Sequence, residues 1–216
     1  MTLCLEVHVD ASQAARHLAG LIAERARKSV EIRGTFTFAV SRGAELVARL
    51  SEENVPWPYV TVFQVDERVA PSDHEDRNLT QLFAALPIDA IRPMPVEDPD
   101  LEAAAARYAN SLPQALDLVH LGLGRDGHTA SLVPGDPVLD VRDRPVAVTA
   151  EHRGRRRMTL TYPALDGARE IMWLVTGERK RDALARLLES DPSIPAARVV
   201  NVRQRIVADR TAAQRR

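Results

Sequence analysis

One glycine-rich segment holds the densest group of side chains that could carry out chemistry. It reads GLGRDGHTASL over residues 122–132. Glycines permit a left-handed backbone and a close approach to a ligand, and an imidazole can remove a proton from water. Asp126 and His128 are therefore candidates for acid–base chemistry. The alternative is structural: Asp126 would cap a turn, and His128 would be a polar side chain satisfied by its neighbours.

The same glycines have the letter pattern G-x-G-x-x-G of dinucleotide-binding loops. Such a loop opens an apolar helix and is followed by an acidic residue, whereas here the pattern runs directly into His128. The chain also lacks H-x-x-x-H and H-E-x-x-H pairs, a second cysteine beside Cys4, and the nucleophile elbow G-x-S-x-G. We therefore expect no dinucleotide at this loop, no catalytic metal and no serine nucleophile.

A second concentration of charge follows a strand-like stretch. Asp66 and Arg68 flank a glutamate there, and further charged residues come over 73–78. A guanidinium held between carboxylates could bind a phosphate or an oxyanion. The alternative is an ion-paired surface loop that caps the next helix at Asp76 or Asn78.

Two more basic segments stand at predicted element boundaries. In the run 153–157, strand alternation directs Arg155 and Arg157 to the same side, where they could clamp a phosphate; the alternative is a solvated face. Lys180 follows Gly177 at the start of a predicted helix, an arrangement that favours an anion. Lysine is rare here, because only 2 of the 29 basic residues are lysines. Lys180 is thus a candidate phosphate contact.

The elements that must position these residues alternate along the chain. Period-two and apolar patterns predict strands at 3–9, 35–40, 59–65, 91–96, 116–123, 145–149, 158–162, 170–176 and 205–208. Helical stripes predict helices from residue 12 onward and at 44–50, 79–86, 101–112 and 178–189, with a helix start after the glycine-rich segment. The first strand is expected at a sheet edge, and 116–123, apolar at nearly every position, at the centre.

This alternation predicts the α/β class, with one doubly wound, mostly parallel sheet and helices on both faces. No repeat or linker divides the chain, so we expect a single domain over 1–216 whose arginine-rich tail is frayed from about residue 210. In open α/β sheets the ligand lies outside the carboxyl ends of the strands. The loops to inspect are therefore 41–43, 66–78, 124–135 and 177–180.

Composition excludes several classes of protein. The chain has 216 residues, 45% of them hydrophobic, which is enough for a large core. Its net charge of −1 provides no field for nucleic acid or an anionic membrane, and no apolar run is long enough to span one. The single cysteine excludes an internal disulfide and fits a reducing cytoplasm. We expect a cytoplasmic protein without nucleic-acid or membrane partners, either a monomer or a small homo-oligomer.

Four strand-end segments together make the chain resemble the 6-phosphogluconolactonase family, part of a larger family with glucosamine-6-phosphate isomerase/deaminase. The first is VDER at 65–68 with PSDH at 71–74 and Asn78. The others are GLGRDGHTASLVPG at 122–135, RMTLT at 157–161 and GERK at 177–180. The likeness extends from about residue 36 to residue 208. It implies hydrolysis of 6-phospho-D-glucono-1,5-lactone, the second step of the oxidative pentose phosphate pathway, with no cofactor and a small sugar-phosphate lactone as substrate.

The resemblance also implies roles for individual residues. His128 would be the general base with Asp126 beside it, Arg68 would contact the substrate, and Arg157 and Lys180 would contact its phosphate. The remaining residues expected to bind substrate or phosphate are Ser41, Arg42, Gly43, Asp66 and Gly127. The first strand-end loop departs from the family: relatives show a Ser-Gly-Gly-Ser-Thr-Pro-like loop, whereas this chain reads SRGAE at 41–45. Arg42 either adds a cation to the phosphate site or obstructs it.

Two other functions remain open. The deaminase branch resembles Asp-Gly-His-Ile-Ala-Phe-Asn-Glu-Pro at the glycine-rich loop and uses an acid soon after the histidine. Here no carboxylate occurs between His128 and Asp136, which favours the lactonase. The alternatives are an aminosugar-6-phosphate deaminase or isomerase, with Asp66 as proton-transfer base, and a catalytically degenerate sugar-phosphate binder.

Overall fold

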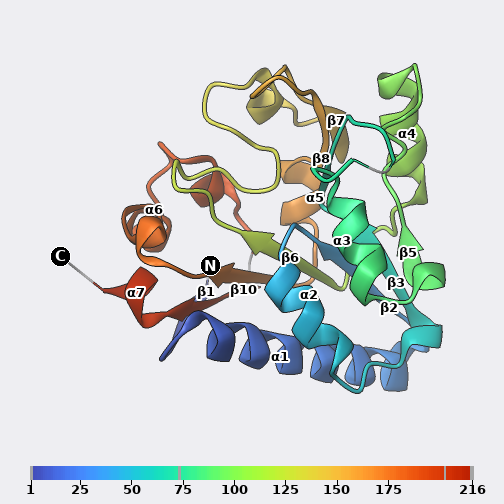
Figure 1. Cartoon of the computed structure of the whole chain (residues 1–216). Helices are drawn as coiled ribbons and strands as arrows, with labels where there is room; N and C mark the ends of the chain where they lie inside the picture. The colour runs from blue at the N-terminus through green and yellow to red at the C-terminus, as the bar shows by residue number, and fades with distance from the viewer. Residues whose placement is uncertain (1, 73, 202, 215–216) are drawn as a thin grey trace.

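A seven-stranded parallel sheet runs through the centre of the molecule (Figure 1). Its strand order is β1-β10-β9-β6-β2-β3-β5, with the predicted edge strand at one end and the apolar strand in the middle. The strands are β1 (Thr2–His8), β2 (Phe36–Val40), β3 (Val60–Gln64), β5 (Ile91–Arg92), β6 (Leu118–Gly122), β9 (Ile171–Val175) and β10 (Arg203–Asp209). This computed structural model describes residues 2–72, 74–201 and 203–214. Asp73 and the last two arginines, which the sequence analysis considered, lie outside the described residues.

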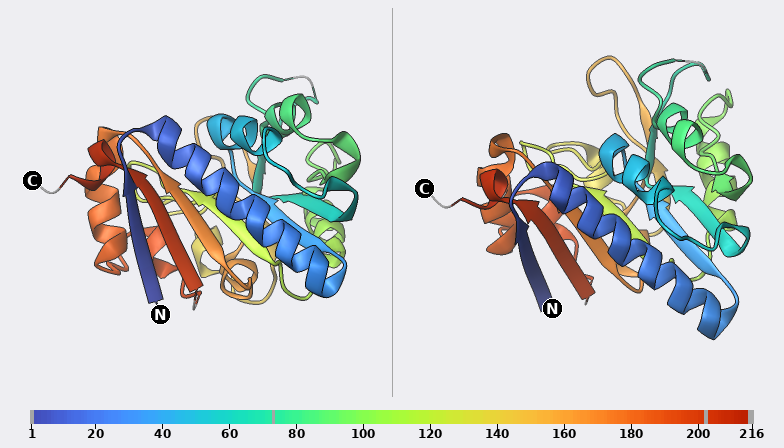
Figure 2. Two further views of the ribbon diagram at one scale, coloured as in Figure 1. Left: turned by 90° about the horizontal axis from the view of Figure 1, so that it is seen from below. Right: turned by 60° about the horizontal axis from the view of Figure 1, so that its bottom comes forward.

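Helices cover both faces of the sheet, as the alternation predicts. One face packs against α1 (Ala11–Arg33), α2 (Ala44–Ser51) and α3 (Asn78–Ala85), and Figure 2 shows α1 crossing it. The other face packs against α4 (Leu101–Ser111), α5 (Tyr162–Asp166), α6 (Arg181–Leu188) and α7 (Arg210–Ala213). Short 3-10 helices are η1 (Trp57–Tyr59), η2 (Ile88–Ala90), η3 (Pro137–Asp140), η4 (Glu178–Lys180) and η5 (Pro195–Arg198).

Side-chain alternation explains why one sheet serves two cores. In β2, Phe36 and Phe38 belong to the core under α1, whereas Ala39 belongs to the opposite core. The same alternation continues in β9, where Met172 faces the α1 side and Trp173 the other. The two cores share this sheet, so the described chain forms a single domain. None of the described helices combines the length and apolar character that crossing a bilayer requires.

The structure also has a second, antiparallel sheet, of which the sequence predicts two strands, at 145–149 and 158–162, but not the third strand or the separation from the main sheet. It has the order β4-β8-β7 and consists of β4 (Asp66–Arg68), β8 (Arg157–Leu160) and β7 (Val146–Val148). Arg68 is the register partner of Arg157 in this sheet. The segments around Arg68 and Arg157, far apart in the sequence, are thereby brought together near the carboxyl ends of the main sheet's strands.

Four predicted boundaries need correction. No helix starts after the glycine-rich segment: a loop continues to η3, because Gly127 and Ala130 take positive φ values of 81° and 50°. The strand predicted at 91–96 is only Ile91–Arg92, and the helix predicted at 178–189 begins as the 3-10 helix η4. The tail is not frayed from residue 210, since the Asp209 side chain caps α7 and Ala212 is buried.

Candidate active site

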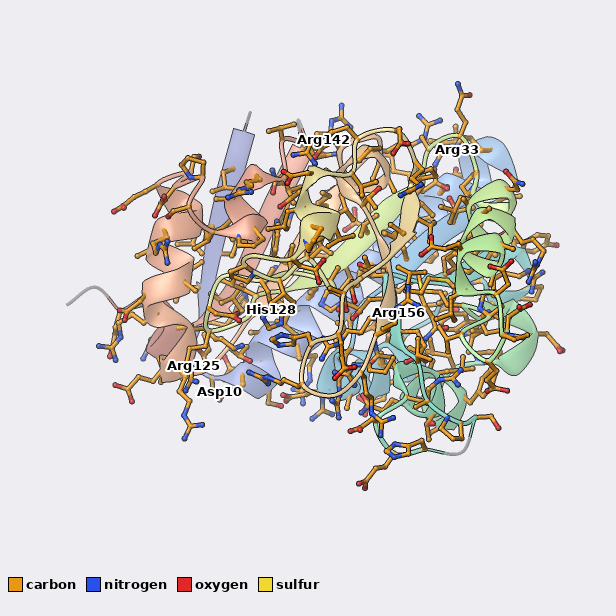
Figure 3. The ribbon with its side chains drawn as sticks, turned by 90° about the horizontal axis from the view of Figure 1, so that it is seen from above. Asp10, Arg33, Arg125, His128, Arg142 and Arg156 are labelled. Atoms are coloured by element: carbon orange, nitrogen blue, oxygen red, sulfur yellow. The ribbon has the colours of Figure 1, made fainter. Side chains whose placement is uncertain are left out.

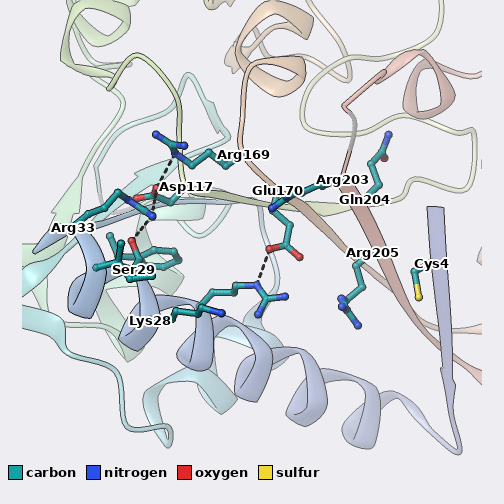
Figure 4. A pocket seen from close by; sticks show the side chains of 13 residues that line it. Cys4, Lys28, Ser29, Arg33, Asp117, Arg169, Glu170, Arg203, Gln204 and Arg205 are labelled. Carbon is teal, nitrogen blue, oxygen red and sulfur yellow. Dashed lines mark hydrogen bonds and ion pairs between the residues drawn. The ribbon is translucent and has the colours of Figure 1, made fainter. Parts of the chain in front are cut away.

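A cavity of about 400 Å³ opens at the carboxyl ends of β2, β6 and β9. In the sheet, β2 lies between β6 and β3. The chain passes from β2 to β3 on one side and later reaches β6 on the other side, so the direction of strand addition reverses at β2, where the cavity lies. The described sequence candidates that line it are Ser41, Arg42, Gly43, Asp66, Arg68, His128, Arg157 and Lys180. A larger cavity of about 500 Å³ lies at the amino ends of the strands (Figure 4), but it holds none of these residues.

His128 and Asp126 form a carboxylate–histidine pair at the rim of the first cavity. The distance from Nδ1 of His128 to Oδ1 of Asp126 is 2.5 Å, and the backbone N–H of His128 donates to the same carboxylate at 3.2 Å. Burial raises the pKa of Asp126, but attraction to His128 and the hydrogen bonds outweigh it and hold this pKa below its usual value. An ionised Asp126 favours the tautomer with hydrogen on Nδ1, which leaves Nε2 of His128 as an acceptor. Figure 3 shows His128 on the loop that also carries Arg125.

Two glycines shape this loop, and neither needs to touch a ligand. A Cβ on Gly124 would lie 2.1 Å from Nδ1 of His128 and 2.6 Å from Oδ1 of Asp126, so only glycine leaves room for the pair. Gly127 has a φ of +81°, and a Cβ there would lie 2.4 Å from Cβ of Ile194. Gly127 is not among the residues that line the cavity, and its positive φ has a role in the turn; its role in ligand binding stays a prediction.

Arg68 and Arg157 lie opposite each other on neighbouring strands of the small sheet and both line the cavity. Like charges directly opposite on paired strands are unfavourable. Burial lowers the pKa of Arg157, and repulsion from Arg68 lowers it further. Arg68 donates through Nη1 to the backbone carbonyl of Asp76 at 2.5 Å, while Nε of each arginine is buried without a partner. The arrangement fits an anion that would be shared by two guanidinium groups.

Lys180 also lines the cavity, and it comes from a different segment of the chain. It stands at the end of η4, directly before α6. The loop that carries it turns at Gly177, whose φ is +92° and whose backbone N–H donates to the Asp209 carboxylate at 3.1 Å. Burial lowers the pKa of Lys180, and Arg125 acts in the same direction, whereas Asp126 opposes the shift. A third cation thus faces the same space as the arginine pair.

The buried carboxylate of Asp66 lies between the Ser41 loop and the glycine-rich loop. The hydroxyl of Ser131 donates to its carboxylate at 2.7 Å, the amide of Asn78 at 3.3 Å and the hydroxyl of Ser41 at 3.5 Å. Burial raises the pKa of Asp66, although the Ser131 hydrogen bond opposes this. Asp66 therefore ties the Ser41 loop to the glycine-rich loop.

Arg42 lines the cavity, but α3 restrains its guanidinium. With the amide of Gln81 oriented so that its oxygen faces the guanidinium, this oxygen accepts from Nε and Nη2 of Arg42 at 3.1 and 3.2 Å. Arg42 thus adds a cation at the edge of the site and is held by a neutral partner.

Other charged residues of the motifs are structural. The Glu67 carboxylate accepts from the backbone N–H groups of Asn78 and Leu79 and caps α3, and it is paired with the buried Arg77. Arg155 precedes β8 and is not among the residues that line the cavity; its guanidinium contacts Asp76 at 3.2 Å. The structure therefore does not pair Arg155 with Arg157 as a clamp in this cavity.

Sequence reasoning missed His120 as a residue of the site. This β6 side chain is 1% exposed, lines the cavity, and has no hydrogen-bond partner for either ring nitrogen. Burial lowers its pKa to about 3, so the imidazole is neutral at physiological pH. A lone histidine in an otherwise apolar strand was the available signal.

Away from this cavity, among the described residues, Glu6, His8 and His17 bring metal-ligand-type atoms within 4.8 Å of one another.

The fold and the site define an α/β enzyme with a histidine–carboxylate pair and a cluster of cations at the carboxyl ends of its strands. A family model described as Glucosamine-6-phosphate isomerases/6-phosphogluconolactonase matches residues 9–208. The chain belongs to this family.

Three relatives show how far the likeness extends. A 6-phosphogluconolactonase from Synechocystis sp. is 36% identical over 200 residues, which covers 83% of each chain. The crystal structure of 6-phosphogluconolactonase from Thermotoga maritima has a TM-score of 0.85 at 23% identity and covers 96% of this chain and 99% of that one. A monomeric glucosamine-6-phosphate deaminase has a TM-score of 0.82 at 18% identity and covers 99% of each chain. Both branches therefore share the fold, and residues of the site must distinguish them.

Proposed function

We propose that the protein hydrolyses 6-phospho-D-glucono-1,5-lactone to 6-phospho-D-gluconate, with His128 as the general base. The observation that carries this proposal is the His128–Asp126 pair at the rim of a cavity that four cations, Arg42, Arg68, Arg157 and Lys180, also line. A histidine base and remote cations suit a substrate with an electrophilic carbonyl at one end and a phosphate at the other. The 36% identical lactonase relative supports the same substrate.

In the proposed reaction, Nε2 of His128 removes a proton from a water molecule as its oxygen attacks C1 of the lactone. The carbonyl oxygen becomes an oxyanion, which Arg68 or nearby backbone N–H groups stabilise. When the tetrahedral intermediate collapses, the bond from C1 to the ring oxygen breaks, and the ring oxygen takes the proton from His128. Asp126 holds the imidazole and stabilises its transient positive charge.

The required acceleration is modest, because a δ-lactone is an activated ester. General base catalysis contributes about 10²- to 10⁴-fold, and each oxyanion donor contributes about 10²- to 10³-fold. These contributions require neither a covalent intermediate nor a metal. Arg157 and Lys180 would bind the phosphate and orient the lactone, so remote binding would raise the rate as well as the affinity.

The competing deaminase reaction would use Asp66, which lines the cavity and whose pKa burial raises. Asp66, however, is already bound by Ser131 and Asn78, and the glycine-rich loop offers no carboxylate between His128 and Asp136. These features favour lactone hydrolysis.

We also propose that the protein is located in the cytoplasm and is a monomer or a small homo-oligomer.

The test is the decay of 6-phosphogluconolactone, generated from glucose 6-phosphate by its dehydrogenase, with and without the protein. A parallel assay measures ammonia release from glucosamine 6-phosphate. We expect lactone decay well above the spontaneous rate and no ammonia. Spontaneous-rate decay combined with ammonia release would replace the lactonase by the deaminase, and the absence of both activities would leave the sugar-phosphate binder.

A further inference from the structure

The cavity at the amino ends of the strands has the composition of an anion site (Figure 4). It measures about 500 Å³, within the range of small-molecule sites, and lies between the second half of α1 and the starts of the central strands. Its lining includes six cations, namely Arg25, Lys28, Arg33, Arg169, Arg203 and Arg205. Only two acidic residues, Asp117 and Glu170, line it with them.

The carboxylates neutralise only part of this charge. Arg33 and Arg169 share Asp117, with nitrogen–oxygen distances of 2.6 and 3.3 Å, and Arg25 contacts Glu170 at 2.8 Å. Asp117 also accepts from the backbone N–H and the hydroxyl of Thr37, so its oxygens are fully used.

Acidic residues outside the cavity wall do not complete the neutralisation. Arg205 contacts Glu6, and Arg25 also approaches Glu24 at 3.7 Å. With both of these acids counted, the six cations still exceed the acidic groups by two. Among the described contacts, the side chains of Lys28 and Arg203 have no hydrogen bond or ion pair.

This excess charge favours a ligand with at least two negative charges. Guanidinium groups and a lysine ammonium are the usual partners of phosphate oxygens. The chain's two lysines each line one of the two cavities, Lys180 at the catalytic end and Lys28 at this end. Apolar surface is also present at Ile32, which lines the cavity and is 65% exposed, whereas Phe36 is buried in the core. The wall therefore suits a phosphate joined to an apolar group.

We propose that this cavity binds an organic phosphate of nucleotide size, separately from the catalytic cavity. The phosphates lie against Lys28, Arg203 and the arginines around Asp117, and the organic part lies against Ile32. The inference does not depend on the lactonase proposal, because it uses none of the residues of the catalytic site.

Calorimetric titration at low salt tests the site with three probes: ATP, inorganic tripolyphosphate and adenosine. We expect ATP to bind more tightly than tripolyphosphate, adenosine not to bind, and ATP affinity to fall as salt is added. Lys28→Glu combined with Arg203→Glu should weaken ATP binding about tenfold or more. Lys28→Gln, which is milder for folding, should weaken it in the same direction.

Two matched variants make the result specific. Arg16→Glu changes the charge of an exposed residue on the same helix outside either cavity, and it should bind ATP like the wild type. Lys180→Gln should also bind ATP normally. Loss of binding in Lys180→Gln would place the anion in the catalytic cavity, and equal loss in Arg16→Glu would reveal non-specific attraction. Either result, or an absence of ATP binding by the wild type, overturns the proposal whether or not the lactone is hydrolysed.

Discussion

The two cavities lie at opposite ends of the same parallel strands and are built differently. At the carboxyl ends, Arg157 and Lys180 form no ion pair among the described contacts, although Asp66 and Asp126 attract them from a distance, and glycine turns shape the His128 loop. At the amino ends, most of the arginines contact carboxylates that also hold the strand starts in place, as Asp117 does for Thr37. The difference agrees with our two proposals, a reaction at the carboxyl ends and the binding of an anion at the amino ends, where ion pairs also hold the strand starts.

Apart from removal of His128 itself, Gly124→Ala should cause the largest loss in the rate of lactone hydrolysis. The new Cβ would lie 2.1 Å from Nδ1 of His128, so the loop must shift and the histidine–carboxylate pair must separate. We expect lactone hydrolysis to fall by about 10²- to 10⁴-fold, the contribution of a general base. Gly20→Ala in α1, which lines neither cavity and whose added Cβ would have its nearest neighbour at 3.8 Å, is the matched control for rate assays. Equal activity of the two variants would contradict the assigned geometry.

Arg157→Ala tests whether the arginine pair binds the phosphate. Loss of a charge-assisted contact should lower kcat/KM for the phosphorylated lactone about 10- to 100-fold. Arg155→Ala, two residues away and bound to Asp76, should stay within about twofold of the wild type because surface ion pairs contribute little. Steady-state kinetics would refute the assignment if Arg155→Ala lowered kcat/KM more than Arg157→Ala.

His120 predicts a pH dependence of stability at the catalytic end. Its folded-state pKa of about 3 lies below the ordinary histidine value of about 6.5, so the unfolded chain binds the extra proton between these values. The free energy of unfolding should therefore fall as the pH falls below about 6.5, with His120 contributing up to about 1.4 kcal/mol per pH unit. Urea unfolding from pH 7 to pH 5 should show a shallower decrease for His120→Gln. Parallel curves for the two proteins would show that this imidazole is not held neutral.

Local patterns predicted the main sheet well, because a strand buried on one face alternates apolar and polar residues, and a strand buried on both faces is apolar throughout. The edge position of β1 and the central position of β6 follow from this pattern. The small sheet was not predictable in the same way. Its strand Asp66–Arg68 has three charged residues that resemble a loop, and its partner at Arg157 is distant in sequence.

The candidate site shows the same limit. The motifs and the family resemblance made His128, Asp126, Arg68, Arg157 and Lys180 candidates, but only the tertiary pairing showed that Arg68 lies opposite Arg157 while Arg155 contacts Asp76. Gly127 was predicted to bind the ligand because glycine-rich loops often bind phosphate, whereas its positive φ and the lack of room for a Cβ beside Ile194 show that the turn itself requires glycine. Buried His120 was missed because a single polar residue does not change an apolar strand pattern.

The most direct test of the account is the rate of 6-phosphogluconolactone decay with His128→Ala, compared with the wild type, with His8→Ala on β1 and with no protein. Circular dichroism confirms that each variant is folded. The account predicts fast decay with the wild type and with His8→Ala, and a rate close to the spontaneous one with His128→Ala. A folded His128→Ala protein that hydrolyses the lactone at the wild-type rate would contradict the assignment of His128 as the base.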